Sequence, residues 1–301
     1  MNLDLTSEQR LLVTSVAALL DRFRSPGGGA HGYVDYSPGL QAELRKSGFL
    51  EVASQADCGL LEAALLIEEI ASRPVSVEAA ATALLTPLIG RCSPPTALAW
   101  ALNRPVRYLS HAEVLCLIQD DDVLVGTPSP EDVTAIDGVV AYPLAVLRTV
   151  PRDAVRFTGA VAAAIRRRAR IGIAAEAAGL MRGALQTTTQ YVKERRQFGQ
   201  PLAHFQAIQH RLAEDAQLVH ACRLLAFRAA YEDDERHAAL ACLYAQEAMR
   251  KLIYDCHQFS GAIGLTLEYP LHLWTYRLKF LQGEAGGRGR QAELLAQQLW
   301  S

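Results

Sequence analysis

The residues with the clearest potential for chemistry lie in one polar corner, between two stretches of helical pattern. Arg195, Gln197 and Phe198 are followed by Gly199, which is typical of a helix end, and by Pro201, which is typical of a helix start. A guanidinium makes charge-assisted hydrogen bonds to phosphate, and a helix N-terminus adds backbone N–H donors. The corner therefore suits a pyrophosphate. A plain polar turn between two helices is the alternative.

Three apolar residues follow this corner at helical spacing. Leu202, Phe205 and Ile208 are expected to lie on one face of a helix over residues 202–231. Next to the polar corner, such a face forms an apolar wall against which a flat adenine ring could pack. The same spacing is also typical of ordinary core side chains, which is the alternative interpretation.

Two motifs in this part of the chain resemble the C-terminal helical bundle of the acyl-CoA dehydrogenase family. The family's corner reads E-R-x-x-F-G followed by F-Q-x-I-Q, and residues 194–209 contain both strings. The family's second element reads Q-x-x-G-G-x-G followed by E-Y-P, and residues 258–270 read Q-F-S-G-A-I-G and then E-Y-P. The resemblance covers residues 161–282, and the two motifs occur in the family's order.

The resemblance implies that the chain contacts FAD. Arg195, Gln197 and Phe198 match positions that touch FAD in the family, and Gln258 and Gly261 match positions that approach the FAD pyrophosphate. Ala262 stands where the family has a second glycine, and its small side chain still permits a close backbone approach. The expected cofactor-binding residues are Arg195, Gln197, Phe198, Leu202, Phe205, Ile208, Gln258, Gly261 and Ala262.

The catalytic base of the family is not found at its usual position. In the family a glutamate removes the α-proton of an acyl-CoA, and the β-hydrogen leaves as hydride to the flavin. Counted from the E-Y-P string, the base position falls on Ala285, and Glu284 is one residue away. We expect Glu284 to be a solvated loop carboxylate. A shortened loop that brings it into register would make it a weak catalytic candidate.

The pattern of residues predicts a mainly α fold with a small β region in the middle. We expect an N-terminal helical domain over residues 1–103, a reduced β domain over 104–160 and a C-terminal four-helix bundle over 161–301. Residues 25–30, with one proline and three glycines, predict a loop. The pair Gly179 and Gly183, four residues apart in a long helix, predicts a close helix contact.

The middle region lacks what full-length family members use to hold the flavin ring and the thioester. Neither a T-E-P-x-x-G-S-D segment nor a W-I-T/S strand occurs between residues 104 and 161. In the family's dimers each FAD lies between one subunit's middle domain and its neighbour's bundle. The chain therefore resembles the small β subunit of α2β2 acyl-CoA dehydrogenases that act on steroid and other bulky acyl-CoAs.

This resemblance implies that FAD is shared with a full-length partner subunit, which holds most of the acyl-CoA, and that an electron-transfer flavoprotein accepts the electrons. Two alternatives stay open. One is a self-sufficient dehydrogenase that uses Glu284 as its base, and the other is a scaffold without a role in flavin binding.

Composition excludes several other classes of function. Thirty basic and 32 acidic residues give a net charge of −2, so nothing indicates a nucleic-acid partner. No apolar run approaches the roughly 20 residues of a membrane span, and the histidines have no metal-ligand spacing. The six cysteines form no CxxC pair and the N-terminus has no secretory pattern, so we expect a cytoplasmic protein with free thiols. Basic residues 166–170 are expected to form a solvated or interface face, with contact to a CoA as the alternative.

Overall fold

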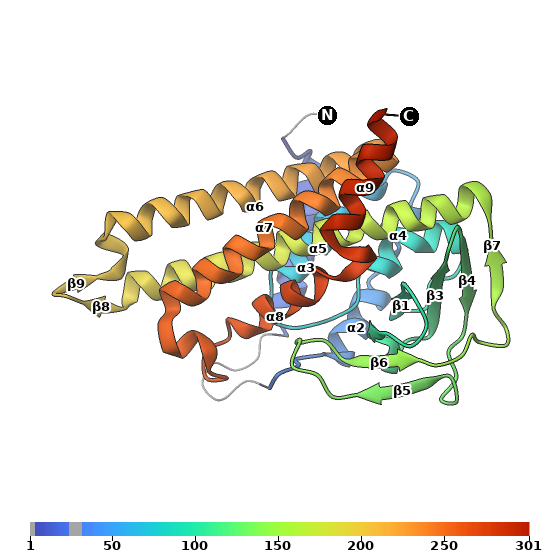
Figure 1. Ribbon diagram of the computed structural model, residues 1–301, viewed down its shortest axis with the longest axis horizontal. Coiled ribbons are helices and arrows are strands. Elements are labelled where there is room, and N and C mark those ends of the chain that lie inside the picture. Colours follow the sequence, from blue (N-terminus) through green and yellow to red (C-terminus); the bar gives the residue numbers. More distant parts are fainter. Residues whose placement is uncertain (1–3, 24–31, 301) are drawn as a thin grey trace.

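The chain folds into a long helical bundle with two small sheets packed at one end (Figure 1). The computed structural model describes residues 4–23 and 32–300. The loop predicted at residues 25–30 lies outside the described residues. The prediction of a mainly α, acyl-CoA dehydrogenase-like fold with a small β region is confirmed.

Three long antiparallel helices form the body of the bundle. They are α5 (Gly159–Glu194), α6 (Gln206–Glu232) and α7 (Glu235–Ser260). After α7 the chain continues through the short η4 (Gly261–Leu265), α8 (His272–Leu281), η5 (Glu284–Gly286) and α9 (Gly287–Trp300). In Figure 1, α9 crosses over α7.

The N-terminal helices cover one side of this bundle. They are α1 (Ser7–Asp21), α2 (Pro38–Lys46), α3 (Leu60–Ala71) and α4 (Ala80–Ile89), with η1 (Phe49–Ser54) between α2 and α3. Thr6 caps α1 in a capping box with Gln9, as its residue type predicts. Side chains from α1, α3, α5, α6 and α7 share one apolar core, so the N-terminal helices and the bundle form one packed unit.

The close helix contact predicted at Gly179 and Gly183 is confirmed. A Cβ on Gly179 would lie 2.2 Å from the carbonyl oxygen of Glu68 on α3. A Cβ on Gly183 would lie 2.5 Å from the carbonyl oxygen of Ser72 and 2.2 Å from the indole nitrogen of Trp274. The two glycines therefore let α3 and α8 approach the middle of α5.

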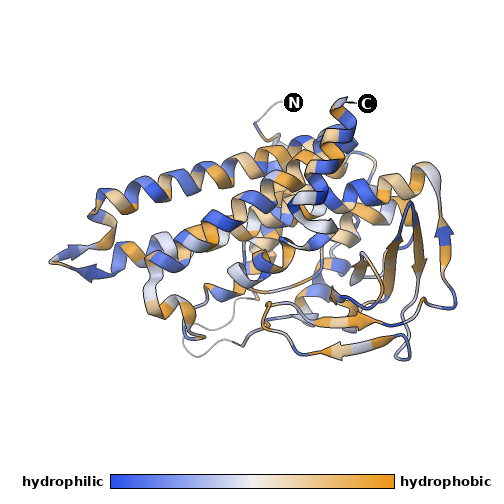
Figure 2. Ribbon diagram, viewed as in Figure 1, coloured by the Kyte–Doolittle hydropathy of each residue, from blue (hydrophilic) through white to orange (hydrophobic). Residues whose placement is uncertain are grey.

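The β region consists of two separate sheets. One has the order β1 (Thr96–Ala99), β3 (Val114–Gln119), β4 (Asp122–Gly126) and β7 (Val155–Phe157), and the other has the order β2 (Pro105–Arg107), β6 (Leu144–Leu147) and β5 (Val133–Ile136). Most pairs are antiparallel, but β1 runs parallel to β3. In Figure 2 the strands β3 and β4 are strongly hydrophobic, which agrees with their burial.

One detail differs from the sequence-based prediction. Strand β1 lies within residues 1–103, which were expected to be helical, because Pro94 and Pro95 prevent a helix there and pairing with β3 buries the strand.

Candidate functional site

The R-x-Q-F-G corner forms a β-hairpin at the far end of the bundle. Strands β8 (Arg196–Gln197) and β9 (Gln200–Pro201) join α5 to α6, and the hairpin projects beyond both helices (Figure 1). The two turn residues, Phe198 and Gly199, have φ angles of 53° and 82°. Two successive positive φ angles are typical of a two-residue hairpin turn, and glycine adopts one without strain. Phe198, in contrast, adopts it at a cost.

The side chains of this hairpin face solvent. Phe198 is 86% exposed and meets the ring of Phe205 edge to face, with 6.1 Å between the ring centroids. Arg195 caps α5: its N–H donates to Tyr191 and its carbonyl accepts from Leu202, both at 2.8 Å. Among the described residues its guanidinium has no hydrogen-bond or ion-pair partner. A strained, exposed aromatic beside an unpaired arginine has no stabilising purpose within the chain, so the hairpin suits contact with something else.

The expected helical wall of Leu202, Phe205 and Ile208 is wrong in its details. Leu202 lies in a short 3-10 turn, η3 (Leu202–His204), and Phe205 is the N-cap of α6, so only Ile208 is helical. The helix starts late because the N–H of Leu202 bonds back to Arg195 and that of Phe205 bonds to Leu202. All three side chains are half-buried at the corner.

The N-terminus of α6 has free hydrogen-bonding capacity. Its N-cap, Phe205, supplies no side-chain hydrogen bond to the first turn. Backbone N–H groups at such an end attract anions. The start of α6 and the guanidinium of Arg195 thus offer phosphate-binding groups in the same corner.

The second predicted element lies at the same end of the bundle. Gln258 is exposed in the last turn of α7, and Ala262 is exposed in η4. Between them, Gly261 has φ 63° and ψ −147°, a conformation essentially limited to glycine, and no atom lies within 4 Å of a Cβ built on it. Its backbone is therefore open to close approach by a ligand.

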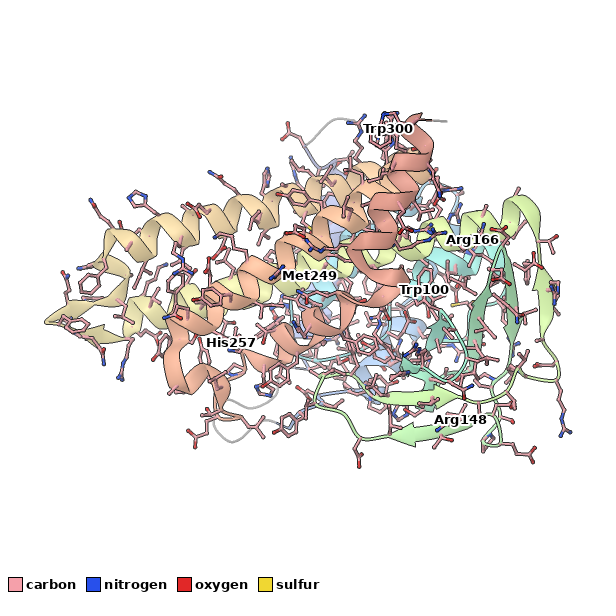
Figure 3. All side chains as sticks on the ribbon, in the orientation of Figure 1. Trp100, Arg148, Arg166, Met249, His257 and Trp300 are labelled. Carbon is pink, nitrogen blue, oxygen red and sulfur yellow. The ribbon has the colours of Figure 1, made fainter. Side chains whose placement is uncertain are left out.

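A shallow groove of about 870 Å³ follows the outer face of α7 and reaches this element. Gln258 and Gly261 line one part of it, and Tyr254 and the exposed cations Arg250 and Lys279 line the rest. In Figure 3, His257 marks this end of α7. The groove is thus open, aromatic and positively charged, which suits an anionic ligand with a flat ring.

Aromatic contacts hold the two predicted elements at one end of the bundle. The rings of Tyr191 on α5 and Tyr269 after η4 lie 5.5 Å apart, and the Tyr269 hydroxyl donates to the carbonyl of Thr187 at 2.8 Å. The guanidinium of Arg211 on α6 lies 4.8 Å from the ring centroid of Phe259 on α7. The structure therefore places Arg195 and Gln258 on the same end, although their side chains do not contact each other.

Glu284 was expected to be a solvated loop carboxylate, and this prediction is wrong. Its side chain is 9% exposed, and Arg107 from β2 binds it through two hydrogen bonds, Nε to Oε1 at 2.8 Å and Nη2 to Oε2 at 3.0 Å. The third branch of the same guanidinium donates to Glu176 on α5 at 2.7 Å. The loop is turned inward because a buried arginine from a distant strand requires carboxylate partners.

Two tyrosines complete this group, which we call the Arg107 cluster: Arg107, Tyr108, Tyr142, Glu176 and Glu284. The Tyr142 hydroxyl donates to Glu176 at 2.7 Å, and the guanidinium lies 4.9 Å from the Tyr142 ring centroid. Burial raises the pKa of Glu284, and Arg107 acts in the opposite direction. Burial lowers the pKa of Arg107, but Glu176 and Glu284 outweigh it and hold that pKa above its ordinary value. Arg107 therefore stays charged.

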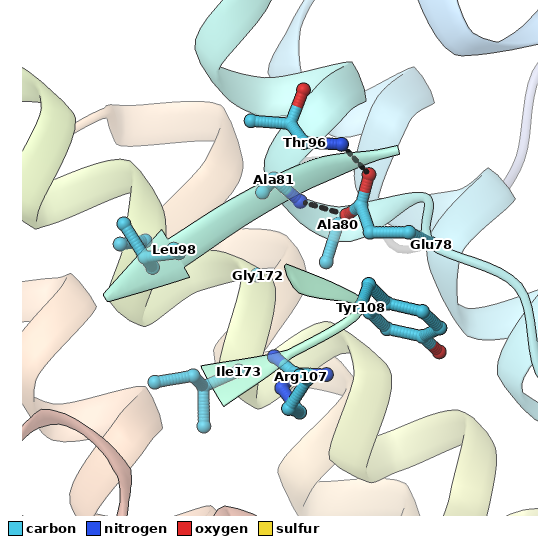
Figure 4. A pocket seen from close by; sticks show the side chains of 10 residues that line it. Glu78, Ala80, Ala81, Thr96, Leu98, Arg107, Tyr108, Gly172 and Ile173 are labelled. Atoms are coloured by element: carbon cyan, nitrogen blue, oxygen red, sulfur yellow. Dashed lines mark hydrogen bonds between the residues drawn. The ribbon is translucent and has the colours of Figure 1, made fainter. Parts of the chain in front are cut away.

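Little space is left around this cluster. A cavity of about 20 Å³ adjoins Arg107 and Tyr108 and is also lined by Glu78 and Thr96 (Figure 4). Glu78 accepts hydrogen bonds from the N–H groups of Thr96 and Ala81. A cavity of this size is too small for an acyl thioester. No local pattern in the sequence predicted this cluster, although Glu176 within an otherwise apolar run indicates a buried charge.

The basic residues near the start of α5, which were expected to form a solvated or interface face, are instead paired within the chain. Arg167 and Arg168 both bind Asp233 after α6, at 2.7 and 3.0 Å, and the 6% exposed Arg170 binds Glu235 at 2.7 Å. Arg166, labelled in Figure 3, contacts Asp121. The pairs with Asp233 and Glu235 hold the end of α6 and the start of α7 against α5.

The described residues contain no group of three or more histidine, cysteine, aspartate and glutamate side chains placed to hold a metal ion. Likewise, none of the helices in the described ranges combines the length and apolarity that a membrane crossing requires. The six cysteines are free thiols, and four of them are buried.

Known proteins match both the fold and the C-terminal half of the chain. Residues 160–300 match the family model described as acyl-CoA dehydrogenase, C-terminal domain. The rat mitochondrial short/branched chain specific acyl-CoA dehydrogenase is 37% identical over 107 residues, which are 34% of this chain and 25% of that protein. In three curated relatives the matched stretch covers only 25% to 36% of the relative's own length.

Solved structures match over nearly the whole chain. The ChsE4-ChsE5 complex from Mycobacterium tuberculosis contains a chain with a TM-score of 0.82 and 18% identity, with 99% of each chain covered. The Tcur3481-Tcur3483 steroid ACAD G363A variant gives a TM-score of 0.74 and 23% identity, with 97% of each chain covered. The protein thus has the acyl-CoA dehydrogenase fold. Residues 160–300 are similar to the C-terminal domain of acyl-CoA dehydrogenases.

Proposed function

We propose that this chain is one subunit of a heteromeric FAD-dependent acyl-CoA dehydrogenase and that it completes the FAD site of a full-length partner subunit. The observation that carries the proposal is the hairpin, where the unpaired Arg195 and the exposed, strained Phe198 project away from the chain's own core. Groups that point outward and lack internal partners are suited to a ligand held by another subunit.

The residues at this end of the bundle fit a dinucleotide. Arg195 and the start of α6 provide donors for phosphate oxygens, while Gln197 adds an amide. Leu202, Phe205 and Ile208 provide half-buried apolar contacts, and Phe198 adds an exposed ring. Bound FAD supplies the hydride acceptor of the reaction. The contribution of this chain is to bind, orient and shield that cofactor.

The second element extends the same site. Gln258 offers a side-chain amide, and the open backbone at Gly261 permits close approach of a pyrophosphate. Ala262 lies next to it and is small enough to preserve that approach. Arg250 and Lys279 in the adjoining groove add positive charge.

The base and most of the acyl-CoA site belong to the partner in this proposal. The position of the family's base is Ala285, and the neighbouring Glu284 is bound to Arg107. The cavity beside Arg107, about 20 Å³, does not admit a thioester. The partner must therefore supply the carboxylate that removes the α-proton.

The substrate class, assembly and location rest on similarity. The structural neighbours include a complex of two named chains, a steroid enzyme and an electron-transferring flavoprotein from Acidaminococcus fermentans. These neighbours support a heteromeric assembly that acts on a bulky, steroid-derived acyl-CoA. We further propose an α2β2 stoichiometry, a cytoplasmic location and an electron-transfer flavoprotein as the electron acceptor.

A self-sufficient dehydrogenase that uses Glu284 as its base is the alternative. Burial raises the pKa of this carboxyl, as a general base often requires. Against it, both oxygens of Glu284 are bound to Arg107 and the carboxyl is closed off from solvent. A scaffold without a flavin role leaves the unpaired Arg195 and the exposed Phe198 unexplained.

Co-expression with a full-length dehydrogenase tests the proposal. We expect one FAD per heterodimer and yellow colour only when both chains are present. Arg195→Ala removes charged hydrogen bonds to phosphate, so FAD affinity should fall roughly 10- to 100-fold, equivalent to about 1.5–3 kcal/mol. The control is Arg228→Ala, an exposed arginine on α6 far along the chain from the corner. Unchanged flavin content in Arg195→Ala would contradict the site assignment, and colour in the isolated chain would favour the self-sufficient alternative.

A further inference from the structure

The Arg107 cluster joins three parts of the molecule that are distant in sequence. Arg107 comes from β2, Glu176 from the middle of α5, and Glu284 from η5. The side chains of these three residues are 11%, 8% and 9% exposed. A buried charged group of this kind is expensive unless every partner is present, so its retention needs an explanation beyond stability.

The guanidinium of Arg107 covers both carboxylate oxygens of Glu284. Its Nε and Nη2 cover the two oxygens of Glu284, its Nη1 binds Glu176, and the ring of Tyr142 lies against it. An external ligand that reaches Glu284 would therefore have to displace the guanidinium. The Arg107 side chain therefore lies where a ligand of Glu284 would bind.

Contacts other than those of Arg107 also hold the loop that carries Glu284. The side-chain amide of Gln246 donates to the carbonyls of Leu281 and Glu284, at 3.0 and 2.9 Å. That of Gln291 donates to the carbonyl of Ala285 at 2.7 Å. Ala285 itself has a φ of 55°, an unfavourable conformation that persists because these contacts fix it. Removing the Arg107 side chain should thus leave Glu284 in position.

We propose that the Arg107 side chain occupies the position beside Glu284 where an external ligand would bind, and that its removal opens a cavity which binds a free guanidinium ion. Arg107 then keeps Glu284 from any external ligand, which agrees with the proposed function, in which the partner subunit supplies the base. The closure of the site itself depends on geometry alone.

Carboxyl labelling of the full chain tests the proposal. A water-soluble carbodiimide with an amine, read by mass spectrometry, should leave Glu284 unlabelled in the unchanged protein while it labels Glu131, which is 84% exposed. In Arg107→Ala, Glu284 should become labelled. About 50 mM guanidinium, well below denaturing concentrations, should suppress that labelling and raise the Tm of the variant, whereas an equal concentration of sodium chloride should do neither.

Several outcomes would overturn the proposal. They are labelling of Glu284 in the unchanged protein at the rate of Glu131, no labelling in folded Arg107→Ala, and labelling that guanidinium does not suppress. Arg148→Ala, the change of an exposed arginine near β6, should have no effect on Glu284.

Arg107→Lys covers the case in which the alanine variant does not fold. It keeps the charge but not the two-branched contact, so Glu284 should be labelled faster than in the unchanged protein, and an equal rate would count against the proposal. FAD content of the co-expressed complex, measured on the same samples, tests the proposed function separately. Labelling that follows the prediction while FAD is absent would reject the shared flavin site and leave the closure by Arg107 intact.

Discussion

The hairpin end and the Arg107 cluster contain the same kinds of side chain, which are exposed at the hairpin and buried in the cluster. At the hairpin, Arg195 has no partner among the described residues and Phe198 is 86% exposed. At the cluster, Arg107 binds two carboxylates and its neighbour Tyr142 is 1% exposed. One arginine is available to a ligand and the other is fully used within the chain.

This difference indicates where the chain can contribute chemistry. Helix α5 connects the two regions: Glu176 lies near its middle, and Arg195 caps its end. With 36 residues the helix is about 54 Å long. The middle of the helix is packed on all sides and serves the fold, whereas its end extends past the core. A subunit that completes a neighbour's site needs this arrangement.

The largest effect is expected when glycine is replaced by alanine in the packed middle of α5 and, for comparison, at the hairpin. Gly179→Ala should destabilise the protein by at least about 3 kcal/mol, because the new Cβ would lie 2.2 Å from a carbonyl oxygen of α3. Gly199→Ala should cost only about 1 kcal/mol, from its φ of 82°, since nothing lies within 4 Å of its Cβ. Urea unfolding measures both. Similar costs at the two positions would show that the hairpin is more tightly packed than its geometry indicates.

The next largest effect concerns the cluster. Glu284→Gln keeps the side-chain volume but removes one of the two charges that neutralise Arg107. Glu176 still compensates part of the charge, so the loss should be about 2–3 kcal/mol rather than the larger cost of an unpaired ion. Thermal unfolding measures it, with the exposed pair member Glu131→Gln as control.

The same variant also separates the proposed function from its alternative. In the co-expressed complex, dehydrogenase activity of Glu284→Gln should equal that of the unchanged complex at a temperature where both are folded. Loss of a general base lowers rates by roughly 10²- to 10⁴-fold. A loss of that size would identify Glu284 as the base and favour the self-sufficient enzyme.

The sequence predicted the exposed region better than the buried one, for a physical reason. The hairpin residues are consecutive, so the turn between two helices could be inferred from local spacing, although the start of α6 could not. The cluster brings together Arg107, Glu176 and Glu284, which are separated by 69 and 108 residues and belong to different elements. No local pattern identifies partners at such separations, and Glu284 was therefore predicted to be solvated.

Local signals also failed where tertiary contacts decide the conformation. Residues 96–99 contain two alanines and one leucine, which favour helix, yet they pair with β3. Leu202 and Phe205 have helical spacing, but hydrogen bonds back to the hairpin delay the start of α6.

The next prediction concerns Asp233, which pairs with the basic residues at the end of α5 opposite Arg195. Burial acts to raise the pKa of Asp233, but hydrogen bonds from Arg167 and Arg168 outweigh it and hold that pKa below its ordinary value of 3.8. A lowered folded pKa contributes stability that is complete above the unfolded pKa and disappears as the pH falls through the folded value. Asp233→Asn should therefore cost about 1 kcal/mol near neutral pH, and this cost should fall as the pH drops below 3.8 and disappear below the lowered folded pKa.

Asparagine suits this test because it tolerates the left-handed conformation of Asp233, whose φ is 43°. Stability is measured by urea unfolding as a function of pH. A cost that stays constant down to pH 3 would show that Arg167 and Arg168 do not depend on this charge. They would then be available for a ligand, as Arg195 is.

The smallest effect on stability is expected at the hairpin tip. Phe198→Gly removes an exposed ring and relieves a φ of 53°, while it loses the edge-to-face contact with Phe205. These terms oppose each other, so the free energy of unfolding should change by less than about 0.5 kcal/mol. FAD content of the co-expressed complex should nevertheless fall, because the ring would be missing from the shared site. Tyr231→Phe, a change at a 58% exposed aromatic on α6, should alter neither quantity. If Phe198→Gly lowered stability by several kcal/mol and left FAD unchanged, the hairpin would be a structural element like the Arg107 cluster, and the contrast between the two regions would disappear.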